Sequence, residues 1–180
     1  MNNFVNIVLL FMLSNTPPLL FDFGSKKMET NWYVVNDDVM GGLSTSSMIE
    51  STNSIVFKGT ISLKNNGGFA SIRSPRKSYD LSAFKTISLR FKSTGREFGI
   101  VLERYNRFYR PTHQLVFSSD SNEWVTATFP IKTFKERVLG KETGNFIDIE
   151  TLKKIERIGI ILFDEKEGAF SLEVDYIRFD

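Results

Sequence analysis

The sequence predicts an all-β protein, an antiparallel β-sandwich of the jelly-roll kind. Apolar and polar side chains alternate with a period of two in several stretches, most clearly at 55–63 and 87–91, which is typical of half-buried strands. These stretches are short, and tight-turn residues such as Thr94-Gly95 separate them. Phenylalanine occurs 17 times, which suits a packed β-core. Long chain crossings beside short hairpins favour a jelly roll over other sandwiches.

Taken in order, the pattern predicts about ten short strands and at most one helix. The apolar run at 157–163 is nearly continuous, which predicts a strand covered on both faces. In the last strand the alternation slips near Asp175, which predicts a β-bulge. The expected strands lie at residues 19–23, 32–35, 43–50, 55–63, 69–73, 87–91, 97–104, 112–118, 124–129, 157–163 and 170–179.

The segments between these strands are predicted from their composition. Residues 105–111 form an aromatic and basic loop, and residues 132–144 lack any period, which predicts a long surface loop. Residues 147–155 place isoleucine and leucine at helical spacing, and Asp148 stands near the start, where a negative charge suits the helix dipole. One short helix is therefore expected there.

Composition excludes several classes of function. The chain has 180 residues, and we expect one domain at 19–180. Its net charge of +2, with scattered Lys and Arg, argues against nucleic acid as a partner. The absence of cysteine excludes disulfides, thiol nucleophiles and cysteine–zinc sites, and His113 is the only histidine. His113 falls in an alternating strand, so we expect it to be a packed residue and not a catalyst.

The N-terminal residues 1–15 contain an apolar run at 4–13 that only Asn6 interrupts. Its length suits a signal-peptide core and is short for a membrane helix. No Lys or Arg precedes the run, and no small-x-small cleavage site follows it. We therefore keep three alternatives: an export signal, a membrane anchor, or a loosely packed tail. Localisation stays open between the cytoplasm or the membrane surface and export.

Two glycine-rich loops are the main candidates for a functional surface. The first glycine loop, 36–44, reads N-D-D-V-M-G-G-L-S, and the second, 65–73, reads N-N-G-G-F-A-S-I-R. Paired glycines let another group approach the main chain closely, so we expect both loops to build one polar binding surface. The alternative is a pair of ordinary turns. The candidate binding residues are Asn36, Asp37, Asp38, Met40, Gly41, Gly42, Asn65, Asn66, Gly67, Gly68 and Arg73.

Oxygen-rich side chains in these loops raise two further hypotheses. The first is calcium, which prefers such oxygens, although the spacing matches no known calcium loop; its candidate ligands are Asn36, Asp37, Asp38, Asn65 and Asn66. The second is a glycosidase-like carboxylate pair, in which Asp37 or Asp38 would act with Asp22, Glu103 or Glu173. Loop Asn and Asp also often cap turns, and we expect neither a metal nor a cofactor.

A sugar platform is another hypothesis, because aromatic faces beside polar handles suit such ligands. Its aromatic members would be Trp32, Trp124, Tyr105, Phe108 and Tyr109, with Asn65, Asn66, Arg73 or Arg104 bonding sugar hydroxyls. In the simpler alternative, both tryptophans are core anchors. Nucleotide-binding loops are excluded, because neither glycine loop reads G-x-G-x-x-G or contains G-K-[ST], and neither opens a helix.

The two glycine loops also carry a resemblance to a known family, together with other motifs in the same order. These motifs are Trp32, F-K-G at 57–59, L-K-N-N at 63–66, D-L-S-A-F at 80–84, Trp124 before F-P-I at 129–131, I-G-I at 158–160 and G-A-F-S-L-E-V-D-Y-I at 168–177. From about residue 19 to 180, the chain resembles the complex I intermediate-associated protein 30 family. Two places depart from the family pattern: Asp38 replaces a usual glycine, and residues 137–140 replace an arginine–glycine pair.

The resemblance implies a galactose-binding-like β-sandwich and a non-enzymatic role. It implies assembly factors for respiratory complex I, NADH:ubiquinone oxidoreductase, so the expected partners are complex I subunits or intermediates. The alternative is a carbohydrate-binding module of an exported protein, and a hydrolase that uses the loop carboxylates is a third hypothesis. Membrane association through the N-terminus is an expectation from residues 1–15 alone.

Overall fold

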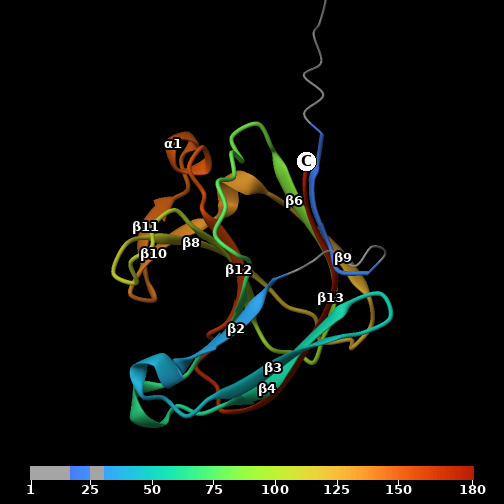
Figure 1. The fold of residues 1–180 in the computed structure, drawn as a ribbon, viewed down its shortest axis with the longest axis vertical. Helices are drawn as coiled ribbons and strands as arrows, with labels where there is room; N and C mark the ends of the chain where they lie inside the picture. Colours follow the sequence, from blue (N-terminus) through green and yellow to red (C-terminus); the bar gives the residue numbers. More distant parts are fainter. Residues whose placement is uncertain (1–16, 25–30) are drawn as a thin grey trace, which may run out of the picture.

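In the computed structural model, residues 17–24 and 31–180 are described, so the expected signal or anchor segment at 1–15 lies outside them. Within these residues, no helix is long and apolar enough to cross a membrane. The described chain forms two antiparallel sheets that pack face to face (Figure 1). This arrangement confirms the all-β, antiparallel sandwich that the alternating pattern predicts.

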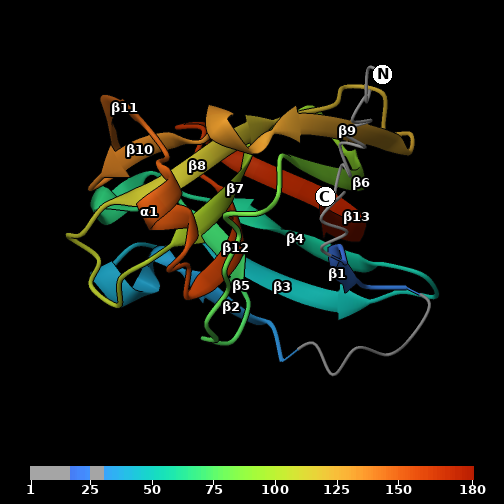
Figure 2. The same cartoon turned by 90° about the horizontal axis from the view of Figure 1, so that it is seen from above.

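The six-stranded sheet has the strand order β3-β4-β13-β6-β9, with β1 paired to the C-terminal half of β13. Figure 2 shows these strands on one side of the molecule. The register slips between Val174 and Tyr176, which confirms the predicted bulge. The strands are β1 (Leu19–Asp22), β3 (Thr45–Glu50), β4 (Ile55–Ile61), β6 (Thr86–Ser93), β9 (Val125–Pro130) and β13 (Gly168–Phe179).

The seven-stranded sheet has the order β11-β10-β8-β7-β12-β5-β2. Its strands are β2 (Tyr33–Asn36), β5 (Ala70–Arg73), β7 (Phe98–Glu103), β8 (Thr112–Phe117), β10 (Lys135–Val138), β11 (Lys141–Phe146) and β12 (Arg157–Leu162). Short helical turns complete the fold: η1 (Asp37–Met40), η2 (Lys64–Asn66), η3 (Ile131–Thr133) and α1 (Ile149–Leu152). The predicted helix is confirmed, and Asp148 caps it by accepting a hydrogen bond from the Thr151 amide.

The core lies between the two sheets and is rich in phenylalanine. Phe57 and Phe170 meet edge to face at 4.9 Å, and Phe91 meets Phe117 at 4.8 Å. Burial of each such side chain stabilises the fold by about 2–3 kcal/mol. In β12, Ile158, Ile160 and Leu162 are buried in this core, whereas Gly159 and Ile161 belong to the opposite, outward face. The prediction that this strand is covered on both faces holds in part, because no residue of the strand is exposed but Arg157 and Ile161 on the outward face are only half-buried.

The prediction of a long surface loop at 132–144 is also wrong, because η3 and the hairpin β10–β11 lie there. Every residue of β11 is exposed, so its side chains need no alternation of apolar and polar types. The main-chain pairing alone defines this edge strand. The turn uses Leu139 and Gly140, both with positive φ, and leucine is an unusual residue at such a position.

Candidate functional site

The two glycine loops meet, and the carboxylate of Asp37 joins them. Asp37 lies in η1 of the first loop and is completely buried. Its carboxylate accepts hydrogen bonds from the amide and hydroxyl of Ser44, and from the amides of Gly68 (2.6 Å) and Phe69 (3.2 Å) in the second loop. Figure 1 shows the two loops side by side at the lower left of the view.

Glycine is required around this carboxylate for two separate reasons. A Cβ at Gly42 would stand 2.4 Å from Cγ of Asp37, so no larger residue fits there while the carboxylate keeps its place. Gly68 has φ of +126°, a conformation that other residues rarely adopt, and this conformation accompanies the amide hydrogen bond to Asp37. The glycines therefore let the main chain close around a buried charge.

The hydrogen bonds decide the ionisation of Asp37. Burial by itself would raise the pKa of this carboxyl, but the bonds from Ser44, Gly68 and Phe69 outweigh it and hold the pKa below its ordinary value. The carboxylate is therefore charged at neutral pH. Because its oxygens accept four hydrogen bonds from the protein, its role in this structure is to fasten the two loops together.

The other predicted binding residues divide by exposure. Asp38, Met40, Gly41, Asn65 and Asn66 are exposed, Asn36, Gly67 and Arg73 are half-buried, and Gly42 and Gly68 are buried with Asp37. The Asn36 side chain accepts a hydrogen bond from the Ser46 hydroxyl, which ties the end of β2 to β3. The predicted residues thus lie together, and a role in binding stays a prediction for the exposed ones.

A groove of about 380 Å³ opens beside these loops on the outer face of the seven-stranded sheet. Its floor comes from β12, β7 and β8, and the two loops supply part of one wall. The lining residues are Met40, Asn66, Gly67, Phe69, Ser71, Arg73, Val101, Glu103, Phe108, Thr112, Gln114, Arg137, Leu139, Gly140, Gly159, Ile160, Ile161 and Phe163. The groove is mostly apolar, with a small number of charged and amide groups.

The strand register explains why the groove is hollow next to Arg73. Arg73 of β5 pairs with Gly159 of β12, which pairs with Val101 of β7, which pairs with Gln114 of β8. The four residues form one row across the sheet, because paired residues of neighbouring strands point to the same side. Gly159 has no side chain, so the floor is low between Arg73 and Val101.

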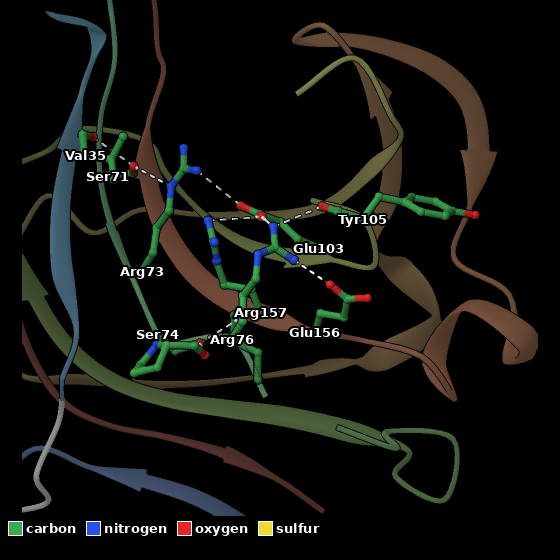
Figure 3. Close-up of polar contacts among 11 residues, drawn as sticks. Val35, Ser71, Arg73, Ser74, Arg76, Glu103, Tyr105, Glu156 and Arg157 are labelled. Carbon is green, nitrogen blue, oxygen red and sulfur yellow. Dashed lines mark hydrogen bonds and ion pairs between the residues drawn. The ribbon is translucent and has the colours of Figure 1, made fainter. Parts of the chain in front are cut away.

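Beside this row, three arginines surround one glutamate, and we call this group the arginine cluster (Figure 3). Glu103 of β7 lies 3.6 Å from Arg73, 3.3 Å from Arg76 and 3.5 Å from Arg157. Arg76 also binds Glu156 at 2.6 Å. Burial lowers the pKa of Arg73, Glu103 opposes that effect, and the like charge of Arg157 adds to it.

The predicted aromatic platform is not assembled in this fold. Trp32 is a buried core residue that packs edge to face on Phe21 and Phe23, as the simpler alternative holds. Trp124 is not a core anchor: it is 37% exposed beside the six-stranded sheet, where Arg90 stacks on it at 4.5 Å. Phe108 and Tyr109 are exposed, and Phe108 alone of the five aromatic residues lines the groove.

The carboxylates proposed as catalytic partners lie on different sheets. Asp22 and Glu173 belong to the six-stranded sheet, and Glu173 binds Lys92 and Ser54 there, whereas Glu103 lies in the arginine cluster of the other sheet. Within residues 17–24 and 31–180, no group of three His, Asp or Glu side chains could hold a metal ion.

His113 is buried as expected, and burial lowers its pKa, so it is neutral at neutral pH.

Sequence reasoning missed most of the groove. Arg76, Arg137 and Arg157 belong to no recognisable motif, and Glu103 enters the prediction only as a possible catalytic carboxylate. These residues are far apart in the chain, and the pairing of β7 with β12 brings Glu103 beside Arg157. Leu139 and Gly140 lie in the segment expected to be a loop. The one available signal was Gly159, a glycine inside an apolar strand, since such a glycine often marks a close approach.

Comparison with known proteins identifies the family. Residues 21–174 match the family described as Complex I intermediate-associated protein 30 (CIA30). The chain belongs to this family. The resemblance that the loop motifs predict is thereby confirmed. A curated relative, mouse "Complex I intermediate-associated protein 30, mitochondrial", is 26% identical over 183 residues, which cover 88% of this chain and 55% of that protein. The chain thus spans about half the length of this relative.

Solved structures with the same fold include carbohydrate-binding modules. A family 11 module from Clostridium thermocellum, in complex with a β-1,3-1,4-mixed-linked tetrasaccharide, has a TM-score of 0.64 at 19% identity and covers 90% of this chain and 94% of its own. The family 11 module of a cellulosomal cellulase from the same organism has a TM-score of 0.64 at 18% identity, with the same coverage. At these identities the likeness concerns the fold alone, and it agrees with a galactose-binding-like jelly roll.

Proposed function

We propose that this chain is a non-catalytic binding module that associates with subunits or assembly intermediates of respiratory complex I. Family membership and the name of the mouse relative support this function. The structural observation that carries it is the rim of the groove. Three large apolar side chains are exposed there: Met40 at 63%, Leu139 at 62% and Phe108 at 78%.

These three residues come from separate segments, namely η1, the β10–β11 turn and the loop after β7. They nevertheless converge on one groove. Exposed apolar groups that gather at one place, with polar groups between them, are typical of surfaces that bind other proteins. Two predicted residues, the exposed Asn66 and the half-buried Gly67, extend this surface along the second glycine loop.

Affinity capture with the full chain, followed by mass spectrometry of the captured proteins, tests the proposal. Complex I subunits should be enriched, and the double variant Met40→Ser with Leu139→Ser should capture several-fold less of them. Ile49→Ser is the matched control, because Ile49 is also exposed but lies on β3 of the other sheet. Normal complex I levels in a strain without the gene would contradict the proposal.

A carbohydrate-binding module is the second candidate. The shared fold of the family 11 modules and the groove with its amide and guanidinium groups favour it. The position of both tryptophans outside the groove speaks against it, since aromatic faces in the site usually hold sugar rings. A glycan array without hits for the full chain would eliminate this candidate, whereas saturable binding of one glycan would establish it.

A further inference from the structure

The arginine cluster carries an inference about what enters the groove. Three guanidinium groups, those of Arg73, Arg76 and Arg157, face the two carboxylates of Glu103 and Glu156, which leaves one positive charge in excess. Glu156 is about half exposed, so solvent weakens its share. Nε of Arg76 and of Arg157 is buried without a hydrogen-bond partner. The cluster therefore holds more cationic donors than its own carboxylates use.

Two members of the cluster line the groove, Arg73 and Glu103, and Arg73 is the cationic one. Its Nε donates to the Ser71 hydroxyl at 3.1 Å, which fixes the orientation of the guanidinium plane. Its Nη1 lies 3.6 Å from Glu103, beyond hydrogen-bond length. Among residues 17–24 and 31–180, nothing accepts a hydrogen bond from its Nη2. The outer edge of this guanidinium is thus oriented, charged and available, which suits two-pronged binding of a carboxylate.

The surroundings of Arg73 indicate which other chemical group the ligand carries beside that carboxylate. The low floor at Gly159 lies directly beside it, and two apolar lining residues follow along the chain, Ile161 in β12 and Phe163 just after that strand. A ligand that matches both the Arg73 guanidinium and this apolar lining carries an acidic group and an apolar group close to each other.

We propose that the groove binds an acidic segment of a partner protein, with an Asp or Glu carboxylate on Arg73 and a neighbouring apolar side chain against Ile161 and Phe163. The inference deepens the proposed function and rests on it. A partner protein is favoured over a sugar acid because large apolar side chains, those of Val101, Ile161 and Phe163, line the same groove as Arg73.

The test uses the full chain and two synthetic peptides that differ in one residue, with Phe-Glu-Phe or Phe-Gln-Phe at the centre. The readout is the side-chain Nε–Hε resonance of each arginine in NMR titrations. We expect the Glu peptide to shift the Arg73 resonance and to bind about tenfold more tightly than the Gln peptide. Equal affinities, no binding of either peptide at millimolar concentration, or shifts that leave Arg73 unchanged would overturn the inference.

Substitutions at Arg73 separate charge from shape. Arg73→Gln should weaken binding of the Glu peptide about tenfold and remove the preference for Glu over Gln, whereas Arg73→Lys should keep part of that preference. Arg178→Gln is the control, since Arg178 is exposed in the other sheet and pairs with Asp180. An unchanged preference in Arg73→Gln would overturn the inference. Salt titration of the unaltered chain gives a second measurement, in which only binding of the Glu peptide should weaken strongly.

A sugar acid is distinguished by a third probe, digalacturonate. Tighter binding of digalacturonate than of the Glu peptide at the same resonances would overturn the choice of a protein segment. Capture experiments separate the two levels of the proposal. If the unaltered chain and Arg73→Gln capture complex I subunits equally, the inference fails and the proposed function stands; if the unaltered chain captures none, the proposed function fails.

Discussion

Arg96, in the turn between β6 and β7, uses all of its donor groups, whereas Arg73, at the end of β5, does not. The guanidinium of Arg96 binds both oxygens of Asp164 at 2.6 and 2.7 Å and donates to the carbonyl oxygens of Lys166, Gly168 and Ala169. Asp164 is almost completely buried, at 1% exposure. Arg73 has one hydrogen bond and one long ion pair.

The difference separates an arginine that holds the fold from one that is free to bind. Five hydrogen bonds from Arg96 organise the turn before β13, and no donor is left for a ligand. At Arg73 the fold fixes the side chain through Ser71 and leaves its outer edge in the groove. A substitution at Arg96 should therefore mainly lower stability, whereas a substitution at Arg73 should mainly weaken binding.

The largest effect is expected at Arg96. Arg96→Met removes the partner of the buried Asp164 carboxylate, so the free energy of unfolding should fall by about 3–5 kcal/mol. Urea unfolding followed by circular dichroism measures this change. Arg178→Met, an exposed pair with Asp180, is the control and should change stability by less than about 0.5 kcal/mol. A loss at Arg96 as small as that of the control would break the distinction between the two arginine sites.

The next largest effect is expected at Asp37, the buried carboxylate that joins the glycine loops. Asp37→Asn replaces one acceptor oxygen with a donor group that faces a main-chain amide in either orientation, that of Ser44 or those of Gly68 and Phe69, which should cost about 2–3 kcal/mol. Thermal unfolding measures the effect. Asp38→Asn is the matched control because Asp38, the next residue in the chain, is exposed. This substitution should leave the melting temperature nearly unchanged. Equal behaviour of the two variants would refute the fastening role of Asp37.

Acid should reduce the difference in free energy of unfolding between the unaltered chain and Asp37→Asn. The folded pKa of Asp37 lies below its unfolded value, so its contribution is fully present above that value and is lost as the pH falls through the folded pKa. The stability gap should therefore narrow below a pH of about 4. Unfolding experiments over an acid pH series, at constant ionic strength, measure this. A gap that stays constant down to the folded pKa would contradict the charge-dependent explanation.

The smallest effect on stability is expected at Arg73. Arg73→Gln loses one long ion pair of a partly exposed side chain and relieves repulsion from Arg157 and Arg76, so the free energy of unfolding should change by less than about 1 kcal/mol. Glu103→Gln should cost more, because it leaves three guanidinium groups facing one another. Urea unfolding of both variants shows which of the two substitutions lowers the free energy of unfolding more. The reverse order would show that Arg73, like Arg96, mainly supports the fold.

The sequence predicts the architecture well because burial produces a visible pattern. Strands with one face in the core alternate, as in β4, β6 and β13, and the slip at Val174–Tyr176 is visible as a change of parity. The hairpin β10–β11 lacks such a signal, because no face of β11 is buried. Main-chain hydrogen bonds define that hairpin, and these leave little trace in side-chain types.

The site is predicted less completely for a related reason. The glycine loops are recognisable because their local backbone needs glycine, at Gly68 by conformation and at Gly42 by close approach. The arginine cluster depends on which strands are neighbours, since Glu103 meets Arg157 only through the pairing of β7 with β12. Strand order is a long-range property, so single charged residues on separate strands give no local indication that they meet.

The two tryptophans have a practical consequence for such experiments. Trp32 packs against Phe21 and Phe23 near the N-terminal strand β1, and Trp124 stacks with Arg90 beside β9 of the same six-stranded sheet. Indole emission therefore reports two places that are both outside the groove lining. Occupation of the groove should leave the emission wavelength unchanged, whereas detachment of β1 should shift the Trp32 contribution to the red and open it to soluble quenchers.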